Sequence, residues 1–96
     1  MIVCANDVVA YGALNAAREL GRSVPGDVSV TGFDDLPEAR WPLLQLTTVA
    51  FDLDGMARRA ASLLVDRIQD GPLEQYRHEW FPSHLVERGT LGPPAH

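Results

Sequence analysis

The sequence predicts an α/β fold in which helices pack on a largely parallel β-sheet. Short strand-like runs and two longer stretches with helical spacing follow one another in the order strand, helix, strand, loop, strand, helix, strand, strand. Strands that alternate with helices favour parallel pairing, because each right-handed crossover carries its helix over one face of the sheet. The chain has 96 residues, 46% apolar and 22% charged, so it is either one small globular domain or part of a larger one.

The first strand and the first helix are expected within residues 1–20. The apolar run Met1–Cys4 predicts a strand. Asn6 or Asp7 can cap a helix over Asp7–Leu20, and Gly21 can end it. The helix is predicted because apolar residues recur at its spacing, at Val9, Ala13, Ala16, Ala17 and Leu20.

A turn, a strand and a loop are expected next. Val24–Asp27 contains Pro and Gly and predicts a turn. Val28–Phe33 alternates apolar and polar residues as a strand does. Leu36–Gln45 holds two prolines and shows no clear period, so it is expected to be a loop with a helical turn around Glu38–Arg40.

The second half of the chain repeats the strand and helix pattern. Leu46–Phe51 is rich in β-branched residues and predicts a strand. A long helix is expected from Asp52 or Asp54 to Gly71. Two short strands and a loose tail complete the expected elements: Tyr76–Phe81, then Leu85–Glu87 after Pro82, then the tail from Gly92 to His96.

The charge and the cysteine content narrow the possible functions. Eight Arg and no Lys against thirteen acidic residues give a net charge of −5, so this chain alone is not expected to bind nucleic acid. Cys4 is the single cysteine and is expected in the core. No apolar run approaches the roughly 18 residues of a membrane span, and the start lacks the order of a secretory signal. A cytoplasmic protein without a membrane partner is expected.

Polar pairs follow the first two predicted strands. Asn6 and Asp7 come after the first strand, and Asp34 and Asp35 come after the second. Ligands of parallel sheets bind beyond the carboxyl ends of the strands, so these pairs can lie on one rim of a cleft. Amide and carboxylate groups together suit a polyhydroxylated ligand such as a sugar. The alternative is that all four residues only cap helices and turns.

Two patterns for catalysis or metal binding lack the residues that they require. Asp52 and Asp54 after a strand are similar to the nucleophile motif of haloacid-dehalogenase-type phosphatases, but no Lys and no downstream acidic pair accompany them. His78 and His84 lie near two glutamates without a metal-binding spacing, and surface positions are expected for them. We therefore expect no enzyme activity, no metal and no cofactor.

One family combines these features in the same order. The segments AND at Ala5–Asp7, VPGDVSVTGFDD at Val24–Asp35, LTTV at Leu46–Val49 and LVERG at Leu85–Gly89 resemble the C-terminal part of the effector-binding region of LacI/GalR-type bacterial transcriptional regulators. The resemblance extends from about Val3 to Gly89. It implies part of a type I periplasmic-binding-protein-like fold with Rossmann-like lobes.

The resemblance also implies roles for single residues. It makes Asn6 and Asp34 effector ligands, and it places Leu53 at a position that often lines the cleft. Asp7 and Asp35 would then hold the loops in shape. The dimer interface that it implies contains Tyr11, Leu14, Asn15 and, in the loop Leu36–Trp41, Trp41.

The family has two lobes joined by three crossings, which implies a division of this chain. Residues 1–48 would belong to the C-terminal lobe, residues 49–82 would form a crossing and a helix of the N-terminal lobe, residues 83–91 would return, and residues 92–96 would be the tail. Thr47, Thr48 and Pro82 would lie at the hinge crossings.

The function implied by the resemblance is control of transcription by a small molecule. The effector would be a sugar, a sugar derivative or a purine, and it would control a helix-turn-helix headpiece that this chain lacks. A homodimer or an element-swapped oligomer is expected, because a half-site leaves a sheet edge and a helix face uncovered. A periplasmic sugar-binding protein of the same fold is the alternative.

Overall fold

The computed structural model describes residues 1–72 and 77–94, and the chain divides into two compact units. The first unit joins residues 1–50 to residues 84–96, and the second contains residues 51–83. These boundaries lie within two residues of those expected at 48/49 and 82/83. The assignment of the units to two lobes stays a prediction. No helix in the described ranges combines the length and the apolar character needed to cross a membrane.

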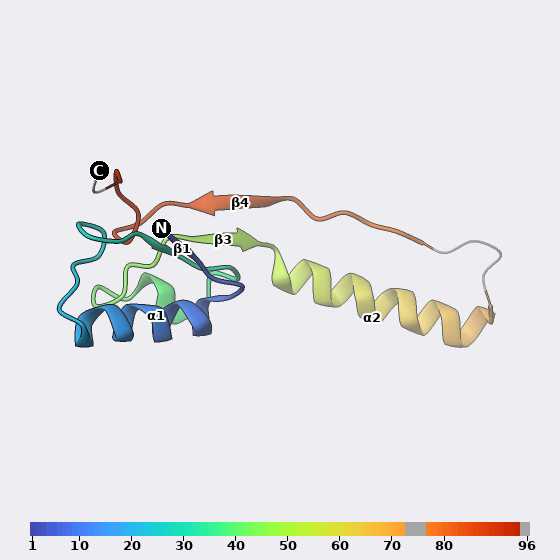
Figure 1. Cartoon of the computed structure of the whole chain (residues 1–96). Coiled ribbons are helices and arrows are strands. Elements are labelled where there is room, and N and C mark those ends of the chain that lie inside the picture. The colour runs from blue at the N-terminus through green and yellow to red at the C-terminus, as the bar shows by residue number, and fades with distance from the viewer. Residues whose placement is uncertain (73–76, 95–96) are drawn as a thin grey trace. The chain divides into compact units, whose positions relative to one another are not determined.

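The first unit is built on parallel strands covered by a helix (Figure 1). β1 (Ile2–Val3) and β2 (Val30–Thr31) pair in parallel, with Ile2 opposite Val30. An isolated parallel bridge from Thr31 to Thr47 extends this arrangement toward the next strand. The predicted parallel sheet is confirmed, although its strands are shorter than the alternation of residues suggests.

The first helix, α1 (Asp7–Glu19), ends within one residue of its predicted bound. Asn6 is its N-cap, and the Asn6 side chain accepts a hydrogen bond from the Val9 N–H at 2.9 Å. Gly21 follows the helix with φ +69°, a conformation that glycine adopts without a Cβ penalty. The capping residues read from the sequence thus have the expected roles.

Small side chains form the core of the first unit. Leu46 and Val30 are its largest fully buried apolar residues. The small side chains of Ala10 on α1 and Ala39 in the loop allow close packing on the sheet, and the predicted burial of Cys4 is confirmed. Four partly buried residues extend this core: Tyr11, Ala13, Leu14 and Val24.

The connections of the first unit follow the prediction. Residues 24–27 form turns and contain a cis peptide bond at Val24–Pro25. The 3₁₀ helix η1 (Pro37–Arg40) is the helical turn expected in the loop. β3 (Thr48–Phe51) pairs with β4 (Ser83–Val86) in a second sheet. Their arrows run in opposite directions in Figure 1, so β3 and β4 are antiparallel to each other.

The second unit contains the long helix α2 (Leu53–Asp70). Asp52 is the N-cap, since its side chain accepts from the Gly55 N–H at 3.0 Å, and Gly71 ends the helix with φ +76°. The predicted helix is therefore confirmed. No residue of α2 is buried, and its apolar side chains remain exposed at Leu53, Leu64, Val65 and Ile68.

The strand expected at Tyr76–Phe81 is absent from the part of it that the structure describes. Tyr76 lies outside the described residues, and residues 77–81 have no regular secondary structure. Side chains hold this segment instead: Arg59 donates to both carboxylate oxygens of Glu79 at 2.7 and 2.8 Å, and Arg77 pairs with Asp66 at 3.4 Å. The sequence predicted a strand here, but a strand also needs a neighbour for its backbone groups.

The end of the chain is attached to the first unit at the start of the expected tail. Gly92 donates to the Ser29 hydroxyl at 3.0 Å, and the same hydroxyl donates to the Gly92 carbonyl at 3.2 Å. The expectation of a loose tail is therefore wrong at Gly92. Residues 95–96 lie outside the described residues.

Candidate functional site

The two polar pairs lie where β1 and β2 end, as in a ligand site of a parallel sheet. The Asp7 N–H donates to the Phe33 carbonyl at 3.0 Å, which places the start of α1 against the loop after β2. Asn6 and Asp34 each adjoin one partner of this hydrogen bond. The structure thus brings together the two chain segments that carry the expected ligand residues.

Asn6 and Asp34 keep hydrogen-bonding groups available. The Asn6 side-chain oxygen caps α1, but its amide N–H groups have no partner among the described residues. The Asp34 backbone N–H donates to the Val49 carbonyl at 3.0 Å, while its carboxylate has no hydrogen bond or ion pair within the described part of the chain. Both residues are half-buried. This rim therefore offers a polar ligand an amide donor, which the cap of α1 holds in place, and a carboxylate acceptor.

Asp7 is fully buried and joins three segments of the first unit. One of its carboxylate oxygens accepts from the Thr48 hydroxyl at 2.6 Å, and the other accepts from the Leu36 N–H at 2.8 Å. Its position in the first turn of α1 also favours the negative charge, because the helix N-terminus is partly positive. A buried carboxylate needs such partners to offset the loss of hydration.

Asp35 is held by two arginines of different exposure. Arg88 donates to one Asp35 oxygen at 2.8 Å, with both side chains only 12% and 14% exposed. Arg40 approaches the other oxygen at 3.4 Å, and its side chain is 65% exposed. Weaker solvent screening makes the Arg88 interaction the stronger one. The prediction from the sequence did not include Arg88.

The two threonines of the LTTV segment are fully buried and hydrogen-bonded. The Thr47 N–H donates to the Thr90 hydroxyl at 2.9 Å, and the Thr47 hydroxyl accepts from the Arg88 N–H at 2.8 Å. The Thr90 hydroxyl in turn donates to the Val30 carbonyl at 2.7 Å. Threonine hydroxyls thus connect the last described segment to the parallel sheet.

Leu53 and Pro82, the other residues expected at the cleft and the hinge, lie in the second unit. Leu53 is the first residue of α2 and is 60% exposed. Pro82 is exposed in the segment just before β4.

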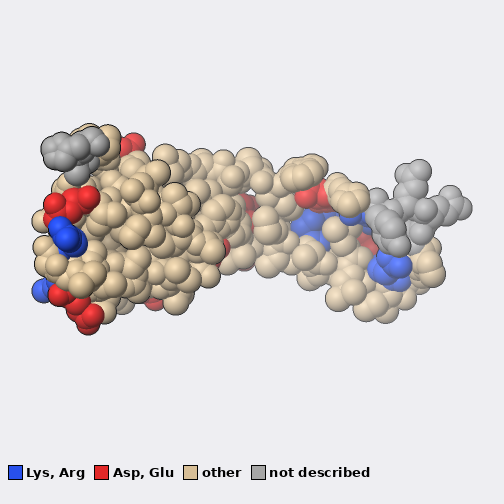
Figure 2. Space-filling view, in the orientation of Figure 1, with Lys and Arg blue, Asp and Glu red and all other residues tan. Residues whose placement is uncertain are grey.

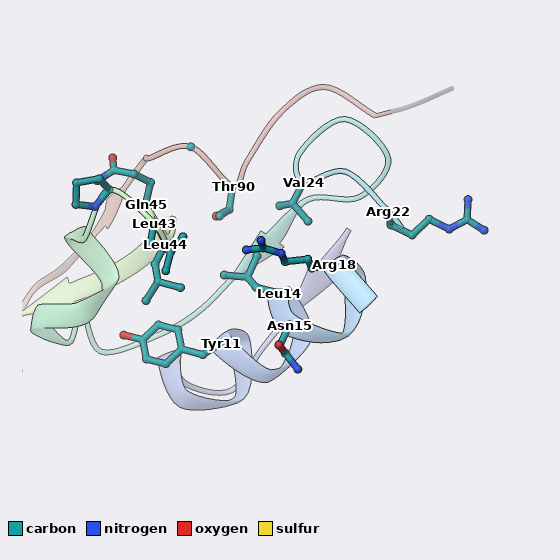
Figure 3. A pocket seen from close by; sticks show the side chains of 12 residues that line it. Tyr11, Leu14, Asn15, Arg18, Arg22, Val24, Leu43, Leu44, Gln45 and Thr90 are labelled. Carbon is teal, nitrogen blue, oxygen red and sulfur yellow. The ribbon is translucent and has the colours of Figure 1, made fainter. Parts of the chain in front are cut away.

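An open groove of about 610 Å³ lies beside α1 and contains three of the residues expected at a dimer interface (Figure 3). Tyr11, Leu14 and Asn15 line it from α1. Its other walls come from residues 42–45 and from Gly89 and Thr90. Trp41, the fourth expected residue, immediately precedes this wall and is 55% exposed.

Polar side chains also line the groove. The Tyr11 hydroxyl is buried without a hydrogen-bond partner among the described residues. Burial raises the pKa of this phenol, and the Asp7 carboxylate adds to the effect. Arg18 reaches over the groove toward Leu14, whereas Arg22 extends away from it (Figure 3). Neither arginine was expected at this surface.

The two aspartates that resemble a phosphatase motif, Asp52 and Asp54, form structural interactions. The Asp52 carboxylate caps α2 at Gly55, and Asp54 forms an exposed ion pair with Arg58 at 3.1 Å. His78 and His84 are exposed, as expected. Within the described ranges, no group of three or more His, Cys, Asp or Glu residues is arranged to hold a metal ion.

Charged side chains of both signs are mixed on the surface. Figure 2 shows Arg next to Asp or Glu in small groups on the visible face, with wide uncharged areas between them. The ion pairs of Arg58 and Arg59 with acidic neighbours fit this pattern.

Comparison with known proteins identifies the family. Residues 2–91 match the family model described as a periplasmic binding protein-like domain. The HTH-type transcriptional regulator MalR of Streptomyces coelicolor is 39% identical over 94 residues, which are 98% of this chain and 27% of that protein. The chain thus spans about a quarter of the length of this relative.

Solved structures of similar sequence share the fold. A LacI-family transcriptional regulator from Enterococcus faecium with bound ribose is 30% identical, with a TM-score of 0.81 over 95% of this chain and 34% of that one. The complex of the transcriptional regulator CelR with cellobiose is 36% identical, with a TM-score of 0.81 over 92% of this chain and 27% of that one. The chain belongs to the periplasmic-binding-protein-like domain family, in the form found in LacI-family transcriptional regulators.

Proposed function

We propose that this chain is part of the effector-binding and dimerising region of a transcriptional regulator that senses a sugar or a related polyhydroxylated molecule. The observation that carries the proposal is the rim after β1 and β2, where the N–H groups of the Asn6 amide and the Asp34 carboxylate have no partner among the described residues. The similar structures that hold ribose and cellobiose support this ligand class. A purine is the second class to test.

The other rim residues serve the site by shaping it. The Asp7 carboxylate accepts from the Leu36 N–H, and the Asp35 carboxylate accepts from Arg88. Both carboxylates are therefore already hydrogen-bonded within the protein, and we do not propose that they contact the effector. Leu53, the first residue of α2, has an apolar side chain that suits the C–H faces of a sugar. Thr47, Thr48 and Pro82 would lie at the crossings between lobes, where closure around the effector is relayed to a DNA-binding headpiece.

Isothermal titration calorimetry of the gene product that contains this chain tests the ligand role. Asp34→Ala should weaken binding of the effector about 10-fold to 100-fold, because a charged hydrogen-bond acceptor is lost. Asn6→Asp retains the cap of α1 but removes the amide donor, and it should weaken binding without unfolding the helix. Asp70→Asn is the matched control, because Asp70 is an exposed acid at the end of α2. Unchanged affinity in Asp34→Ala would refute the assignment.

The groove beside α1 is the proposed dimer surface. Its lining includes Leu14 and the exposed side chain of Leu43, and the Tyr11 hydroxyl at its wall is buried without a partner within the described chain. Exposed Trp41 extends the apolar area, and clustered exposed apolar residues indicate a protein contact. A homodimer through this face, or an element-swapped oligomer, is part of the proposal.

Sedimentation velocity distinguishes association through this groove from association through the exposed face of α2. The chain should sediment as a dimer or a larger species at micromolar concentration. Leu14→Asp should dissociate the assembly, whereas Leu64→Asp on α2 should reduce only association that depends on the helix. A clean monomer, or a Leu14→Asp variant that still dimerises, would contradict the proposed interface.

We also propose that the protein is a cytoplasmic regulator without catalytic activity. Phosphatase assays on a generic ester with magnesium should give equal, negligible rates for the chain and for its Asp52→Asn variant. A rate that depends on Asp52 would contradict this part of the proposal.

A further inference from the structure

We propose that Arg88 is a positioning residue that holds the loop bearing Asp34 in the conformation that a ligand meets. Its effect on effector affinity rests on the function proposed above, whereas its hold on the loop does not. Arg88 touches no expected ligand atom and acts through Asp35.

The loop needs an external hold because its backbone is strained. Asp34 has φ +124° and Asp35 has φ +54°, values in the region that residues with a side chain rarely adopt. Such a conformation persists only where the surroundings stabilise it. The three backbone N–H groups of this loop each have a partner: Asp34 donates to Val49, Asp35 to the Thr48 hydroxyl and Leu36 to Asp7.

Arg88 provides the least exposed ion pair of the loop. One guanidinium nitrogen donates to Asp35 at 2.8 Å, and another donates to the Leu46 carbonyl at 2.9 Å. The Arg88 backbone N–H adds a bond to the Thr47 hydroxyl at 2.8 Å. Arginine suits this position because its planar guanidinium presents several donors in a fixed arrangement, which the single ammonium of lysine does not.

These bonds join segments that are far apart in the sequence. Asp35 and Arg88 are 53 residues apart, and Arg88 lies two residues beyond β4. Leu46 and Thr47 directly precede β3. The segment before β3 and the segment after β4 are therefore both bonded to the residue that holds Asp35. A movement of either segment must break these bonds or carry the loop next to Asp34 with it.

Arg40 supplies a matched control within the same site. It pairs with the other oxygen of the Asp35 carboxylate, but at 3.4 Å and with a side chain 65% exposed. A loss of positive charge beside Asp35 is therefore common to Arg88→Gln and Arg40→Gln. The partly buried bonds to Asp35 and Leu46 are lost only in Arg88→Gln.

Hydrogen exchange of the full chain, measured by NMR, tests the hold on the loop. In Arg88→Gln, the amides of Asp34, Asp35 and Leu36 should exchange roughly tenfold faster or more, because a partly buried charged hydrogen bond is lost. Arg40→Gln should change their rates only slightly. Arg88→Lys should lie between the two, since it retains the charge but not both side-chain bonds. The amides of Cys4 and Leu20, bonded to Thr31 and Ala16, report the sheet and α1 and should not change.

Two results would overturn the inference. Equal acceleration at the loop, at Cys4 and at Leu20 would mean that Arg88 only stabilises the whole unit. Equal exchange rates of the loop amides in Arg88→Gln and Arg40→Gln would mean that the Arg88 bonds to Asp35 and Leu46 do not hold the loop. If Arg88→Gln does not fold, Arg88→Lys against Arg40→Gln gives the same comparison.

Effector titration of the gene product then distinguishes this inference from the proposed function. If both hold, Arg88→Gln weakens effector binding about tenfold while Arg40→Gln does not. If loop exchange responds to Arg88→Gln but neither Arg88→Gln nor Asp34→Ala changes binding, the positioning role stands and the proposed effector site fails.

Discussion

Gly32 and Gly12 should respond in opposite directions to the same substitution by alanine. A Cβ at Gly32 would meet the Asp7 carboxylate at a distance that atoms do not tolerate, and it would lie 3.2 Å from the Asp7 Cα and 3.1 Å from the Leu46 side chain. Both neighbours are fully buried, so neither can move into solvent. A Cβ at Gly12, in the middle of α1, has no neighbour within 4 Å.

The magnitudes follow from these surroundings. Gly32→Ala overpacks the site and displaces the Asp7 carboxylate from its bonds to Thr48 and Leu36, which should lower the free energy of unfolding by about 2–4 kcal/mol. Gly12→Ala relieves the entropic cost of glycine within a helix and should raise it by about 0.5–1 kcal/mol.

Urea denaturation followed by far-ultraviolet circular dichroism measures both variants against the parent chain. The midpoint should fall for Gly32→Ala and rise for Gly12→Ala at equal slope. A Gly32→Ala variant as stable as the parent would refute the argument, because it would mean that Asp7 is not confined at the position described. Loss of stability in Gly12→Ala would show instead that α1 is constrained at that residue by contacts outside this chain.

Three further predictions concern single groups. Thr48→Val should destabilise the chain by about 1–3 kcal/mol in the same urea experiment, because the buried Asp7 oxygen loses its hydroxyl donor, and an unchanged midpoint would contradict the bond. The hydrogen bond from Arg59 lowers the pKa of Glu79. The pair therefore stabilises the folded chain at neutral pH, and its contribution is lost as pH falls through the folded pKa of Glu79. In ¹³C NMR titrations Arg59→Gln should return this pKa toward its ordinary range, and identical titrations of the two proteins would contradict the pair. Burial raises the pKa of the Cys4 thiol, so a thiol reagent should modify the folded chain much more slowly than the urea-unfolded chain, and equal rates would contradict the burial.

Local sequence signals were sufficient for the helices and for the positions of the polar pairs. Helix spacing and capping residues depend on neighbours within a few positions, so the bounds of α1 and α2 followed from Asn6, Gly21, Asp52 and Gly71. The strand expected at residues 76–81 failed in its described part for the opposite reason. Strand formation depends on a partner strand that the local sequence does not reveal.

The residues that support the site had weaker sequence signals. Arg88 lies in the LVERG segment, which helped to place the chain in its family, yet nothing adjacent to it indicates that it pairs with Asp35. Thr90 lies outside the segments that carried the resemblance, and Arg18 had no signal beyond its place in the predicted helix.

The sequence by itself determined the α/β class, the family and the place of Asn6 and Asp34 at the ends of parallel strands, because these depend on short-range patterns and on the order of motifs. Only the tertiary structure decided which of these polar side chains are hydrogen-bonded within the protein and which have no partner among the described residues. Asp7 and Asp34 are both acids at strand ends, but the fold buries the first against Thr48 and Leu36 and leaves the carboxylate of the second without a partner in the described chain. Those partners lie 29 and 41 residues from Asp7, a separation that only chain folding brings within hydrogen-bond distance.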